Sequence, residues 1–543
     1  MSPLAAPATT LSASAIARAV FDIEAALDLN DPVWLQGDVH WWPLYRLEIY
    51  RLLFVAQANG AGGAGGGSGA AGGPSPSWRS RWRQQLGPAL KLRPLGAAGT
   101  AQGLQPNSVP GSVSGSVWLV SDGLSWSRLG DAEVERFCTP LQQWCKELGV
   151  HSALIDRASA TRRLGQGNQH WWAPSLQRRK IAAALLARLW PNPRHARLVQ
   201  RVVEAAARTA VKPPALSARR FDTLARAVLL CAELLHRRMK ADTVRAVFVV
   251  GFYDVTGYAF TLAAARAGVP CVDVQHGVTG PHHLAYTPWP LLPRLLPGWR
   301  LLPSHFWSWS AADAALINGW GQHSQPARLA VCGGHPFLQA WAAGSMKLPA
   351  AMQTRLDHLL QAAQGRQRVL VTLQPGLTHA DALAPLLQAW RLQPEMSWWL
   401  RLHPMALAEG PRIQALAQAH GLASFDIETA TALPLPALLA RAHVHTTHSS
   451  STVIEAQTLG LASVVWSEYG AELAQEQVSA GVATLALDGR SLVEALGRAP
   501  RPEHLSEAAG PAGLGGHNQA SDHSDNPPAQ GPAALRRLLE IKP

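Results

Sequence analysis

Residues 444–466 read VHTTHSSSTVIEAQTLGLASVVW, and this stretch decides the fold class. Residues 444–446 form a short run that predicts a strand, and 462–466 predict a second one. The segment 452–459 between them predicts a helix. A strand, a helix and another strand in direct succession are typical of a parallel sheet whose faces are covered by helices.

The same alternation extends upstream through the second half of the chain and recurs in the first half. Two such runs, separated near 339–348, predict two sheets, because parallel strands need helical crossovers between them. The predicted fold class is therefore α/β, with two facing Rossmann-like domains. We expect strands at 117–120, 153–155, 244–250, 271–274, 329–332, 369–373 and 398–402, and helices within 12–56, 133–148, 257–267, 380–390, 413–419 and 435–442.

Composition divides the chain further. Residues 59–77, 96–116 and 506–532 are rich in small residues and Pro, which offer little to bury, so we expect flexible segments there. The Trp pairs at 41–42 and 398–399 are expected in cores. The expected organisation is a helical N-terminal segment at 1–58, flexible loops with a short ordered piece at 59–116, a first Rossmann-like domain at 117–340, a second at 341–490, and a partly disordered tail at 491–543.

The net charge is +12, and residues 161–240 carry most of it, with 17 Lys and Arg against three acids. We expect this basic block to form two or three helices inserted in the first domain. It predicts an anionic neighbour: the inner surface of a membrane, a phosphorylated lipid acceptor or an acidic glycan. The alternative is a solvated helical face. Nucleic acid is not an expected partner, because the block has neither interleaved aromatic residues nor a known nucleic-acid motif.

Five scattered cysteines without a C-x-x-C pair predict reduced, buried thiols, with no disulfide framework and no zinc site. The first 20 residues lack a basic start followed by an apolar run, so no signal peptide is expected. No uncharged apolar stretch reaches the roughly 18 residues of a spanning helix. We therefore expect a cytoplasmic protein, with peripheral association with the inner membrane as a further expectation.

Three polar clusters fall at the carboxyl ends of predicted strands, which is where doubly wound sheets bind ligands. Gln275, His276 and Gly277 follow one strand, and Arg401 with His403 lies at the end of another. A third strand ends in the sequence HSSST at 448–452, which also opens a helix. The agreement of the three positions indicates one ligand site.

The HSSST segment has the chemistry of a phosphate site. Backbone N–H groups at a helix start favour a diphosphate, and the hydroxyls of Ser449, Ser450, Ser451 and Thr452 add donors. Glu455, one turn into the helix, is placed to accept hydroxyls of a ribose. The alternative is a plain helix cap in which Ser and Glu form a capping box.

Arg401 and His403 flank a single residue, so in an extended segment both side chains point the same way and suit an anionic leaving group. A surface Arg and a cap His are the alternative. At His276, a neutral imidazole facing the second domain could take a proton from an acceptor hydroxyl. The neighbouring Gly277 permits close approach of backbone or ligand. A structural turn His is the alternative at position 276.

In combination these motifs resemble those of bacterial GT-B glycosyltransferases. The order is Gln-His-Gly at 275–277, Gly-x-Pro at 334–336, Arg-x-His-Pro at 401–404 and Ser-Ser-x-x-x-Glu-Ala at 450–456. The group includes capsule polysaccharide biosynthesis proteins and, more distantly, CDP-glycerol glycerophosphotransferases. The HP and Ser-rich motifs are also similar to those of bacterial sialyl- and Kdo-transferases. The resemblance covers about residues 117 to 485.

The resemblance implies transfer of a sugar from a nucleotide-sugar donor to a capsular or surface polysaccharide or to a lipid-linked acceptor. It implies that the domain at 341–490 holds the donor through His403, the serines at 449–451 and Glu455. The domain at 117–340 would hold the acceptor, and His276 matches the position of a proposed base.

The chain also departs from the patterns of these families. It has His448-Ser449-Ser450 where the glycerophosphotransferases have Asp-Tyr-Ser-Ser, and one acid, Asp122, where the sialyltransferases have a pair before Gly. It has no convincing Asp-x-Asp motif, which fits a metal-independent mechanism with neither metal nor cofactor, in which positive groups stabilise the leaving phosphate. Asp122 and Gln374 are further candidates for the site.

Two other functions remain open at this point. A sugar-nucleotide 2-epimerase shares the fold, but would need additional acids near the sugar and has little use for a basic insert. A non-catalytic partner that binds glycan or nucleotide in an export complex is the other alternative, because fold alone does not establish function.

Overall fold

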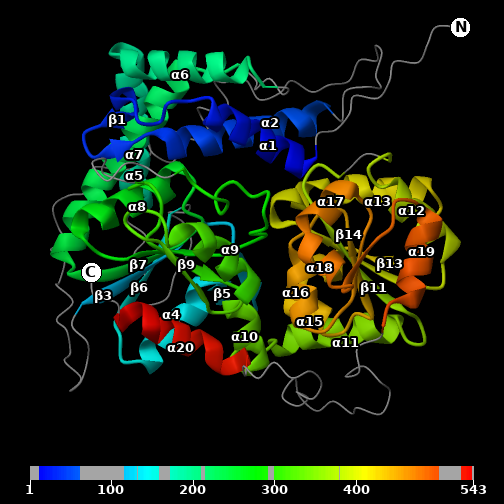
Figure 1. The fold of residues 1–543 in the computed structure, drawn as a ribbon. Helices are drawn as coiled ribbons and strands as arrows, with labels where there is room; N and C mark the ends of the chain where they lie inside the picture. The colour runs from blue at the N-terminus through cyan, green and yellow to red at the C-terminus, as the bar shows by residue number, and fades with distance from the viewer. Residues whose placement is uncertain are drawn as a thin grey trace, which may run out of the picture.

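Two six-stranded sheets organise the computed structural model, and each sheet is parallel throughout. The sheets lie in two domains side by side, with helices on both faces of each (Figure 1). The predicted fold class is therefore confirmed. The structure describes residues 12–60, 115–130, 132–157, 172–209, 215–290, 299–377, 380–422, 424–500 and 527–540.

The first sheet has the order β10-β9-β8-β7-β3-β6, made of β3 (Ser116–Ser121), β6 (Ser152–Asp156), β7 (Val244–Val250), β8 (Cys271–Val274), β9 (His305–Ser308) and β10 (Leu329–Cys332). Along β3, Val117 and Leu119 pack in one core while Trp118 and Val120 pack in another. This alternation is the two-residue period of a strand that is buried on both faces. The short strand β9 was absent from the prediction.

The second sheet has the order β13-β12-β11-β14-β15-β16, made of β11 (Arg368–Leu373), β12 (Ser397–Leu402), β13 (Phe425–Asp426), β14 (Val444–Thr447), β15 (Ser463–Val465) and β16 (Ala483–Leu485). One face packs against α12 (Ala384–Leu392) and α19 (Gly489–Arg498), and the other against α11 (Ala350–Ala362) and α15 (Leu435–Leu439). Trp398 and Trp399 are fully buried on opposite faces, as expected for a core pair.

Both sheets reverse the direction of strand order at one point. In the first sheet, β6 lies on one side of β3 and β7 on the other; in the second, β12 and β14 flank β11 in the same way. Ligands of doubly wound sheets bind beyond the carboxyl ends of the strands at such a reversal. The topology therefore directs attention to the ends of β3 and β7 and to the ends of β11 and β14.

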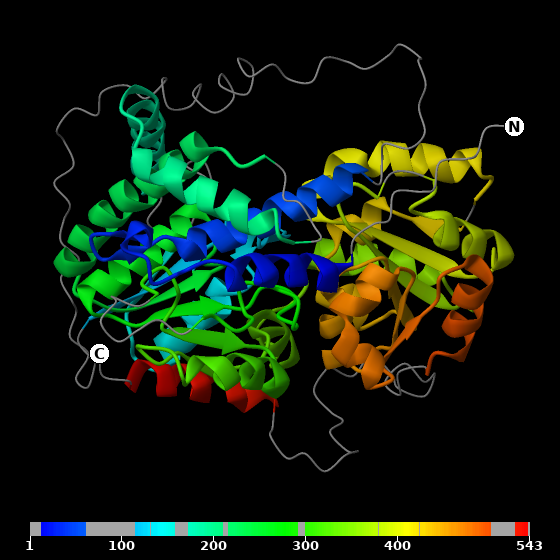
Figure 2. The ribbon, with the colours of Figure 1, turned by 45° about the horizontal axis from the view of Figure 1, so that its top comes forward.

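The basic block forms a helical insert between β6 and β7, with α5 (Trp172–Leu189), α6 (Pro193–Ala206) and α7 (Ala218–Ala241). These helices share a core with α1 (Ala13–Ala25), α2 (Trp42–Gly60) and α8 (Val255–Ala267). Trp41 and Trp42 are fully buried there. Figure 2 shows α1 and α2 lying along the first domain and reaching toward the second.

The predicted helix at 133–148 is wrong in its first part. β4 (Trp126–Leu129) and β5 (Ala132–Glu135) pair antiparallel, and α4 (Cys138–Glu147) begins only after them. The carboxylate of Glu135 accepts the backbone N–H of Phe137 at 2.9 Å and that of Cys138. These bonds satisfy the first N–H groups of α4, so the helix starts where the strand ends.

The helix α20 (Pro527–Glu540) packs against α4 and α10 (Pro336–Ala342) of the first domain. Leu535 of α20 is fully buried in the core that α4 shares with the sheet. Most of the segments expected to be flexible, 59–77, 96–116 and 506–532, lie outside the described residues. Where the structure describes them, the expectation is wrong at 527–532, which belong to α20, and at Ser116, which opens β3.

Candidate active site at the domain junction

Several contacts and close approaches between described residues join the two domains on the side where the strands end. Nε2 of His335 lies 3.0 Å from Oε1 of Glu455 in α16 (Thr452–Thr458), and Ile454 packs against the first-domain core that contains Phe137. Ser14 Oγ and backbone N–H donate to Glu472 of α17 (Glu468–Leu473). A Cβ on Gly280 would lie 3.9 Å from the carbonyl oxygen of Leu473. The loops after β8 and β14 therefore belong to one junction.

His276 follows β8 and faces the ends of β3 and β7. Its Nδ1 lies 3.4 Å from the carbonyl oxygen of Val274, which can only accept, so Nδ1 carries the proton and Nε2 is the acceptor. The Tyr253 hydroxyl donates to Nε2 over 3.0 Å. Gly251 has φ of +70°, and a Cβ there would lie 3.0 Å from Cε1 of the imidazole. Glycine therefore both permits the turn after β7 and leaves room for the ring.

The pKa of His276 lies below its ordinary value. Burial lowers this pKa most, the charge of Asp122 raises it, and the charges of Arg157 and Arg136 lower it. The imidazole is therefore neutral at neutral pH and is able to accept a proton at Nε2. Arg157 is held in place by the carbonyl oxygens of Val250 and Gly251, at 2.8 and 3.1 Å.

Asp122 lies at the end of β3, the strand at which the order of the first sheet reverses. Its Oδ1 accepts the N–H groups of Leu124 and Ser125 at 2.7 and 2.8 Å, and Oδ2 accepts the Ser125 hydroxyl. Burial raises the pKa of Asp122, but the charge that His276 carries when it is protonated in acid and these hydrogen bonds outweigh it, so the pKa lies below its ordinary value. Asp122 is thus an anion close to the imidazole, and its part in a ligand site stays a prediction.

Two buried acids support this side of the junction. Burial raises the pKa of Glu135 to about 7 and that of Asp273 to about 7. Asp273 accepts the N–H of Phe252 at 3.0 Å and the hydroxyl of Tyr286 at 2.9 Å. Because both carboxyls are enclosed by such donors, they act on the shape of the turns and not on a ligand directly.

On the second domain, Gln374 joins the two strands at which the order reverses. Its Oε1 accepts the N–H of Ser449 at 3.2 Å, and its Nε2 donates to the Thr447 hydroxyl at 3.2 Å. The Thr447 hydroxyl donates to the carbonyl of Thr372 at 2.8 Å and accepts the N–H of Ser450 at 3.3 Å. Gln374 and Thr447 therefore fix the start of the serine-rich turn.

The serine-rich turn bonds to the start of α16 through Ser450, whose Oγ accepts the N–H of Thr452 at 3.2 Å. Ser450 Oγ lies 2.9 Å from the Thr452 hydroxyl, and Ser449 Oγ lies 3.0 Å from Nδ1 of His448. Ser451, the first residue before α16, makes no side-chain cap bond. The capping box of Ser with Glu455 is absent, because Glu455 is bonded to His335 instead. Phosphate binding by this turn stays a prediction.

Arg401 and His403 do not act as a matched pair. The Arg401 guanidinium donates to the carbonyl oxygens of Ala430 and Thr431, at 2.8 and 3.3 Å, and to that of Leu433. His403 Nδ1 accepts the N–H of Met405 at 3.1 Å, so the alternative of a cap His describes its present contact. Arg401 therefore supplies positive charge at the junction with part of its donor capacity already used.

Arg136 is the residue that sequence reasoning missed. It follows β5, and its guanidinium is half-buried with the Phe137 ring 5.5 Å away. Its charge lowers the pKa of His276 on the first domain, after the larger effect of burial, and likewise the pKa of His403 on the second. Among the described residues no acid pairs with it. Within the described ranges, Arg136 is thus a cation without an acidic partner whose charge acts on both halves of the site.

Glu455 and Gln275 have partners that the prediction did not anticipate. Burial raises the pKa of Glu455, but the His335 bond and the charges of Arg136 and Arg401 leave it below its ordinary value, so Glu455 is an anion. Gln275 Nε2 donates to Asp313, and its Oε1 accepts the backbone N–H of Trp309 at 2.7 Å. Gln275 therefore has a structural role, because both ends of its amide are bonded to the protein. A Cβ on Gly277 would meet open space, so no protein atom requires glycine there.

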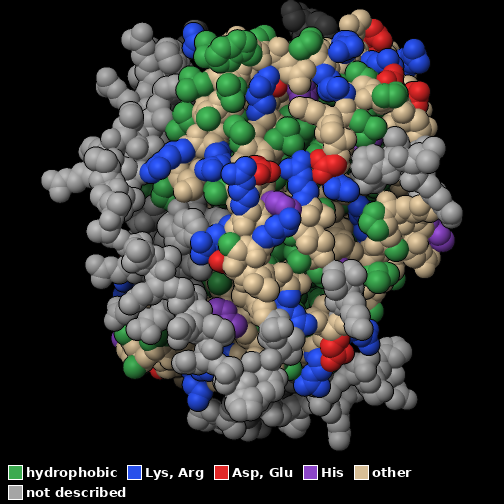
Figure 3. Space-filling view, turned by 90° about the vertical axis from the view of Figure 1, so that its left-hand side faces the viewer, with side chains coloured by type: hydrophobic (Ala, Val, Ile, Leu, Met, Phe, Trp, Pro, Cys, Tyr) green, Lys and Arg blue, Asp and Glu red, His purple; other side chains and the backbone are tan. Residues whose placement is uncertain are grey.

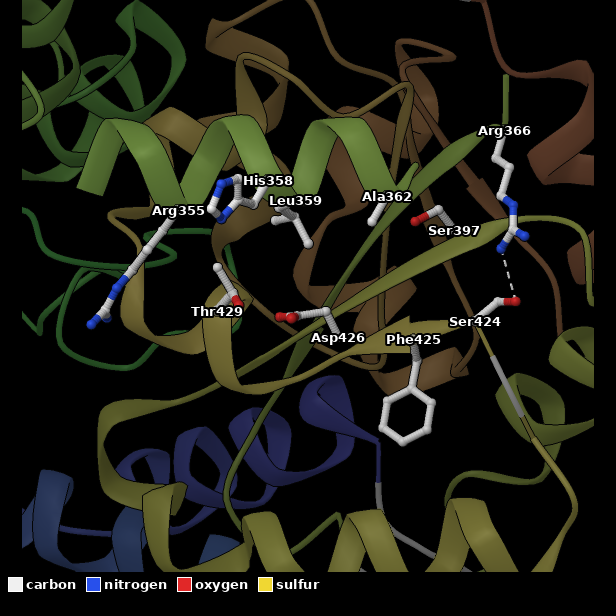
Figure 4. A pocket seen from close by; sticks show the side chains of 10 residues that line it. All are labelled: Arg355, His358, Leu359, Ala362, Arg366, Ser397, Ser424, Phe425, Asp426 and Thr429. Carbon is white, nitrogen blue, oxygen red and sulfur yellow. Dashed lines mark hydrogen bonds between the residues drawn. The ribbon is translucent and has the colours of Figure 1, made fainter. Parts of the chain in front are cut away.

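A hollow with a volume of about 440 Å³ lies away from the junction, between α11 and the edge of the second sheet (Figure 4). Its lining includes Arg355 and His358 of α11, Ser397 at the start of β12 and Asp426 of β13. Because Ser397 opens its strand, this hollow is at the opposite end from the site residues. The predicted ligand site and this hollow are therefore different places.

No group of three or more His, Cys, Asp or Glu in the described ranges could hold a metal ion. Within the same ranges, no helix is both long and apolar enough to cross a bilayer.

No protein-family model and no curated protein matches this chain. Among solved structures, it is similar to a UDP-GlcNAc 2-epimerase from Neisseria meningitidis bound to UDP-GlcNAc, with 14% identity, a TM-score of 0.41, and coverage of 70% of this chain and 90% of that one. It is similar to the Methanocaldococcus jannaschii UDP-GlcNAc 2-epimerase in complex with UDP-GlcNAc and UDP, with 11% identity, a TM-score of 0.43, and coverage of 78% and 98%. It is also similar to the glycotransferase of kitacinnamycin, with 13% identity, a TM-score of 0.38, and coverage of 78% and 94%. Likenesses this weak assign neither an activity nor a substrate to the chain.

Proposed function

We propose that this chain transfers a glycosyl group from a nucleotide-sugar to a surface glycan or a lipid-linked acceptor in the cytoplasm. The observation that carries the proposal is Arg136, which has no acidic partner among the described residues and whose charge lowers the pKa of His276 on one domain and that of His403 on the other. A leaving phosphate between a proton acceptor and a set of neutral donors needs such a cation. The nucleotide would lie on the second domain and the acceptor on the first.

In the proposed reaction, Nε2 of His276 takes the proton of the acceptor hydroxyl. The acceptor oxygen then forms a bond to the anomeric carbon, and the bond from that carbon to the nucleotide phosphate breaks with its electron pair on the phosphate oxygen. The Tyr253 hydroxyl occupies Nε2 at 3.0 Å until the acceptor hydroxyl replaces it. Asp122 would stabilise the imidazolium that forms, because its carboxylate is an anion close to the ring.

Arg136 would stabilise the departing phosphate together with the hydroxyls of the serine-rich turn. Arg401 is less suited to direct contact, because its guanidinium already donates to the backbone carbonyls of Ala430 and Thr431. Positive charge from protein side chains supports a mechanism that needs no metal ion and no cofactor. His403, Ser449 and Ser450 would then fix the nucleotide end of the donor.

One observation favours the 2-epimerase alternative, which requires acids near the sugar. Asp122 is an anion beside His276, and Glu135 lies in the same region of the first domain. However, Glu135 is fully buried, whereas Asp122 is partly exposed, so of these two acids Asp122 is the one that a ligand can reach. An assay of released nucleotide separates the two activities, because transfer frees the nucleotide while epimerisation leaves it attached to the sugar.

The test begins with thermal-shift measurements on the full chain with CMP, CDP, UDP, GDP and their sugars, because a nucleotide that binds only the folded chain stabilises it. We expect nucleotides with one of the three nucleobases, cytosine, uracil or guanine, to raise the unfolding temperature of the chain. Arg136→Ala should weaken that nucleotide about tenfold or more, because a charge-assisted hydrogen bond contributes ~1.5–3 kcal/mol.

The matched control is Arg128→Ala, which removes an exposed Arg from the same hairpin, where its Nε donates to the carbonyl of Gly130 at 3.0 Å. This variant should bind the nucleotide as the parent does. Absence of stabilisation by all four nucleotides and their sugars would contradict the proposal, and so would equal losses in the two Arg variants.

A further inference from the structure

The basic insert contains two kinds of cation. In α7, Arg226, Arg237 and Arg238 each pair with an acid of the same helix or its end, at 2.7 to 2.8 Å. Residues 172–209, which contain α5 and α6, carry eight Lys and Arg against one acid. One of the eight, Arg201, pairs with an acid, Asp31. The positive charge of the insert is therefore concentrated on α5 and α6.

Exposed apolar side chains lie on the same helices. Leu185, Leu189 and Trp190 at the end of α5 are 48%, 61% and 65% exposed, and Trp190 is the most exposed large hydrophobic residue that the structure describes. Leu185, Arg188 and Leu189 are three and four residues apart, so they adjoin on one face of the helix. We call Leu185, Arg188, Leu189 and Trp190 the α5–α6 corner.

The corner is held in position by α7. Arg226 donates to the carbonyl oxygen of Trp190 at 2.7 Å, and Asp222 accepts the N–H of Asn192 at 2.9 Å. Asn192 in turn caps α6 through the N–H of Arg194. The turn that displays Trp190 is therefore fixed before any partner arrives, and little conformational freedom is lost on contact.

Figure 3 shows the side of the molecule on which these helices lie. Lys and Arg side chains gather over its upper half, with few acids among them, and hydrophobic side chains are exposed along the top edge. Cations beside a projecting Trp and Leu match the boundary of an anionic bilayer, where headgroups attract the charge and the interface accepts the rings. A second copy of this chain fits less well, because it would bring like charges together.

We propose that the α5–α6 corner docks the chain on an anionic lipid surface, with Leu189 and Trp190 entering the interface and Arg188 contacting headgroups. None of the corner residues belongs to the candidate site at the domain junction. Lipid binding by the corner can therefore be tested independently of the proposed transfer reaction.

The experiment is co-sedimentation of the full chain with vesicles of phosphatidylglycerol and phosphatidylcholine in equal parts, and with vesicles of phosphatidylcholine alone. We expect binding to the anionic vesicles that weakens as salt is added, and little binding to the neutral ones. The double variant Leu189→Ser with Trp190→Ser should lower the affinity for anionic vesicles about tenfold or more. Because both side chains are largely exposed, thermal unfolding should not change.

The control is Leu392→Ser with Leu407→Ser, which removes two side chains that are 55% and 56% exposed on the second domain. It should bind vesicles as the parent does. Equal vesicle binding by the two double variants would overturn the inference. The inference would also be overturned if the parent chain formed a dimer without lipid and the double variant of Leu189 and Trp190 were monomeric, because a second copy would then occupy the corner.

Discussion

The two sides of the domain junction differ in the chemistry they hold. On the first domain, the ends of β3, β7 and β8 bring together groups that gain or lose protons, with Asp122 close to His276 and the buried Asp273 in β8. On the second, the ends of β11 and β14 present an amide and hydroxyls, from Gln374 and Thr447 onward. The first side is equipped to move a proton, and the second to hold a ligand without changing charge.

The histidine buried in the second sheet strengthens this contrast. His445 in β14 lies 2.9 Å from the Thr372 hydroxyl and 2.9 Å from that of Ser463, and burial lowers its pKa to about 3. It therefore stays neutral over the whole physiological range. His445 therefore adds no proton exchange to the ends of β11 and β14.

The largest effect should follow from removing the base. His276→Ala takes away the one neutral imidazole at the end of β8, so transfer should fall by roughly 10²–10⁴-fold, the range for loss of general-base catalysis. Nucleotide affinity, measured by thermal shift, should stay within about twofold, because His276 belongs to the side that moves the proton.

The control for that measurement is His323→Ala, an exposed imidazole of the same domain that should leave activity unchanged. If His276→Ala kept full activity, or weakened the nucleotide as strongly as the rate, the division between the two sides would be wrong. Full function in a biological assay would point instead to a module that only binds.

A smaller effect should come from the second domain, and it should fall on nucleotide affinity and not on the proton-transfer step. Thr447→Val removes the hydroxyl that accepts the N–H of Ser450 and donates to Thr372, so the serine-rich turn loses its anchor. Nucleotide affinity should fall about tenfold, equivalent to ~1.4 kcal/mol, while the pH profile of the reaction keeps its shape.

Thr446→Val is the matched control, because the Thr446 hydroxyl donates to the carbonyl of Val464 inside the sheet and does not touch the turn. It should lower thermal stability and leave nucleotide affinity unchanged. If the two variants weakened the nucleotide equally, loss of stability would explain both, and the turn would have no special part in binding.

The sequence predicted the fold more fully than the site. The periodicity in 444–466 and the polar clusters at 275–277 and 448–452 located both sheets and the strand ends, because parallel strands leave long apolar runs and short turns. β9 escaped because a four-residue strand follows a long irregular segment. β5 was predicted as part of a helix, because its Ala and Glu residues favour a helix and its single Val gives only a weak strand signal.

The site residues that the sequence did not reveal are those that contacts between distant segments bring to the junction. Arg136 carries no motif, and its place at the junction depends on the pairing of β4 with β5 and on the contact of His335 with Glu455. Tyr253 likewise reaches His276 only because β7 and β8 are neighbours. A functional residue that lies outside any recognisable pattern becomes visible only when the topology brings it to the site.

The smallest expected effect concerns the pKa of His276 and the part that Asp122 has in setting it. The negative charge of Asp122 raises the pKa of His276, against the larger lowering by burial and the lowering by Arg157 and Arg136. Asp122→Asn removes that charge and so lowers the pKa of His276 further. Because the base works in its neutral form, kcat/KM falls as pH drops through this pKa, and the acidic limb should move to lower pH by roughly half a unit to one unit.

The turn itself should survive the Asp122→Asn substitution, because one amide oxygen can still accept the N–H groups of Leu124 and Ser125 that Oδ1 now accepts. Thr447→Val, measured alongside, should leave the limb where it is. A limb that moved to higher pH would show that Asp122 does not act on His276 through its charge. Loss of nearly all activity in Asp122→Asn, with activity retained in His276→Ala, would show that the carboxylate is the base and that the imidazole is its support.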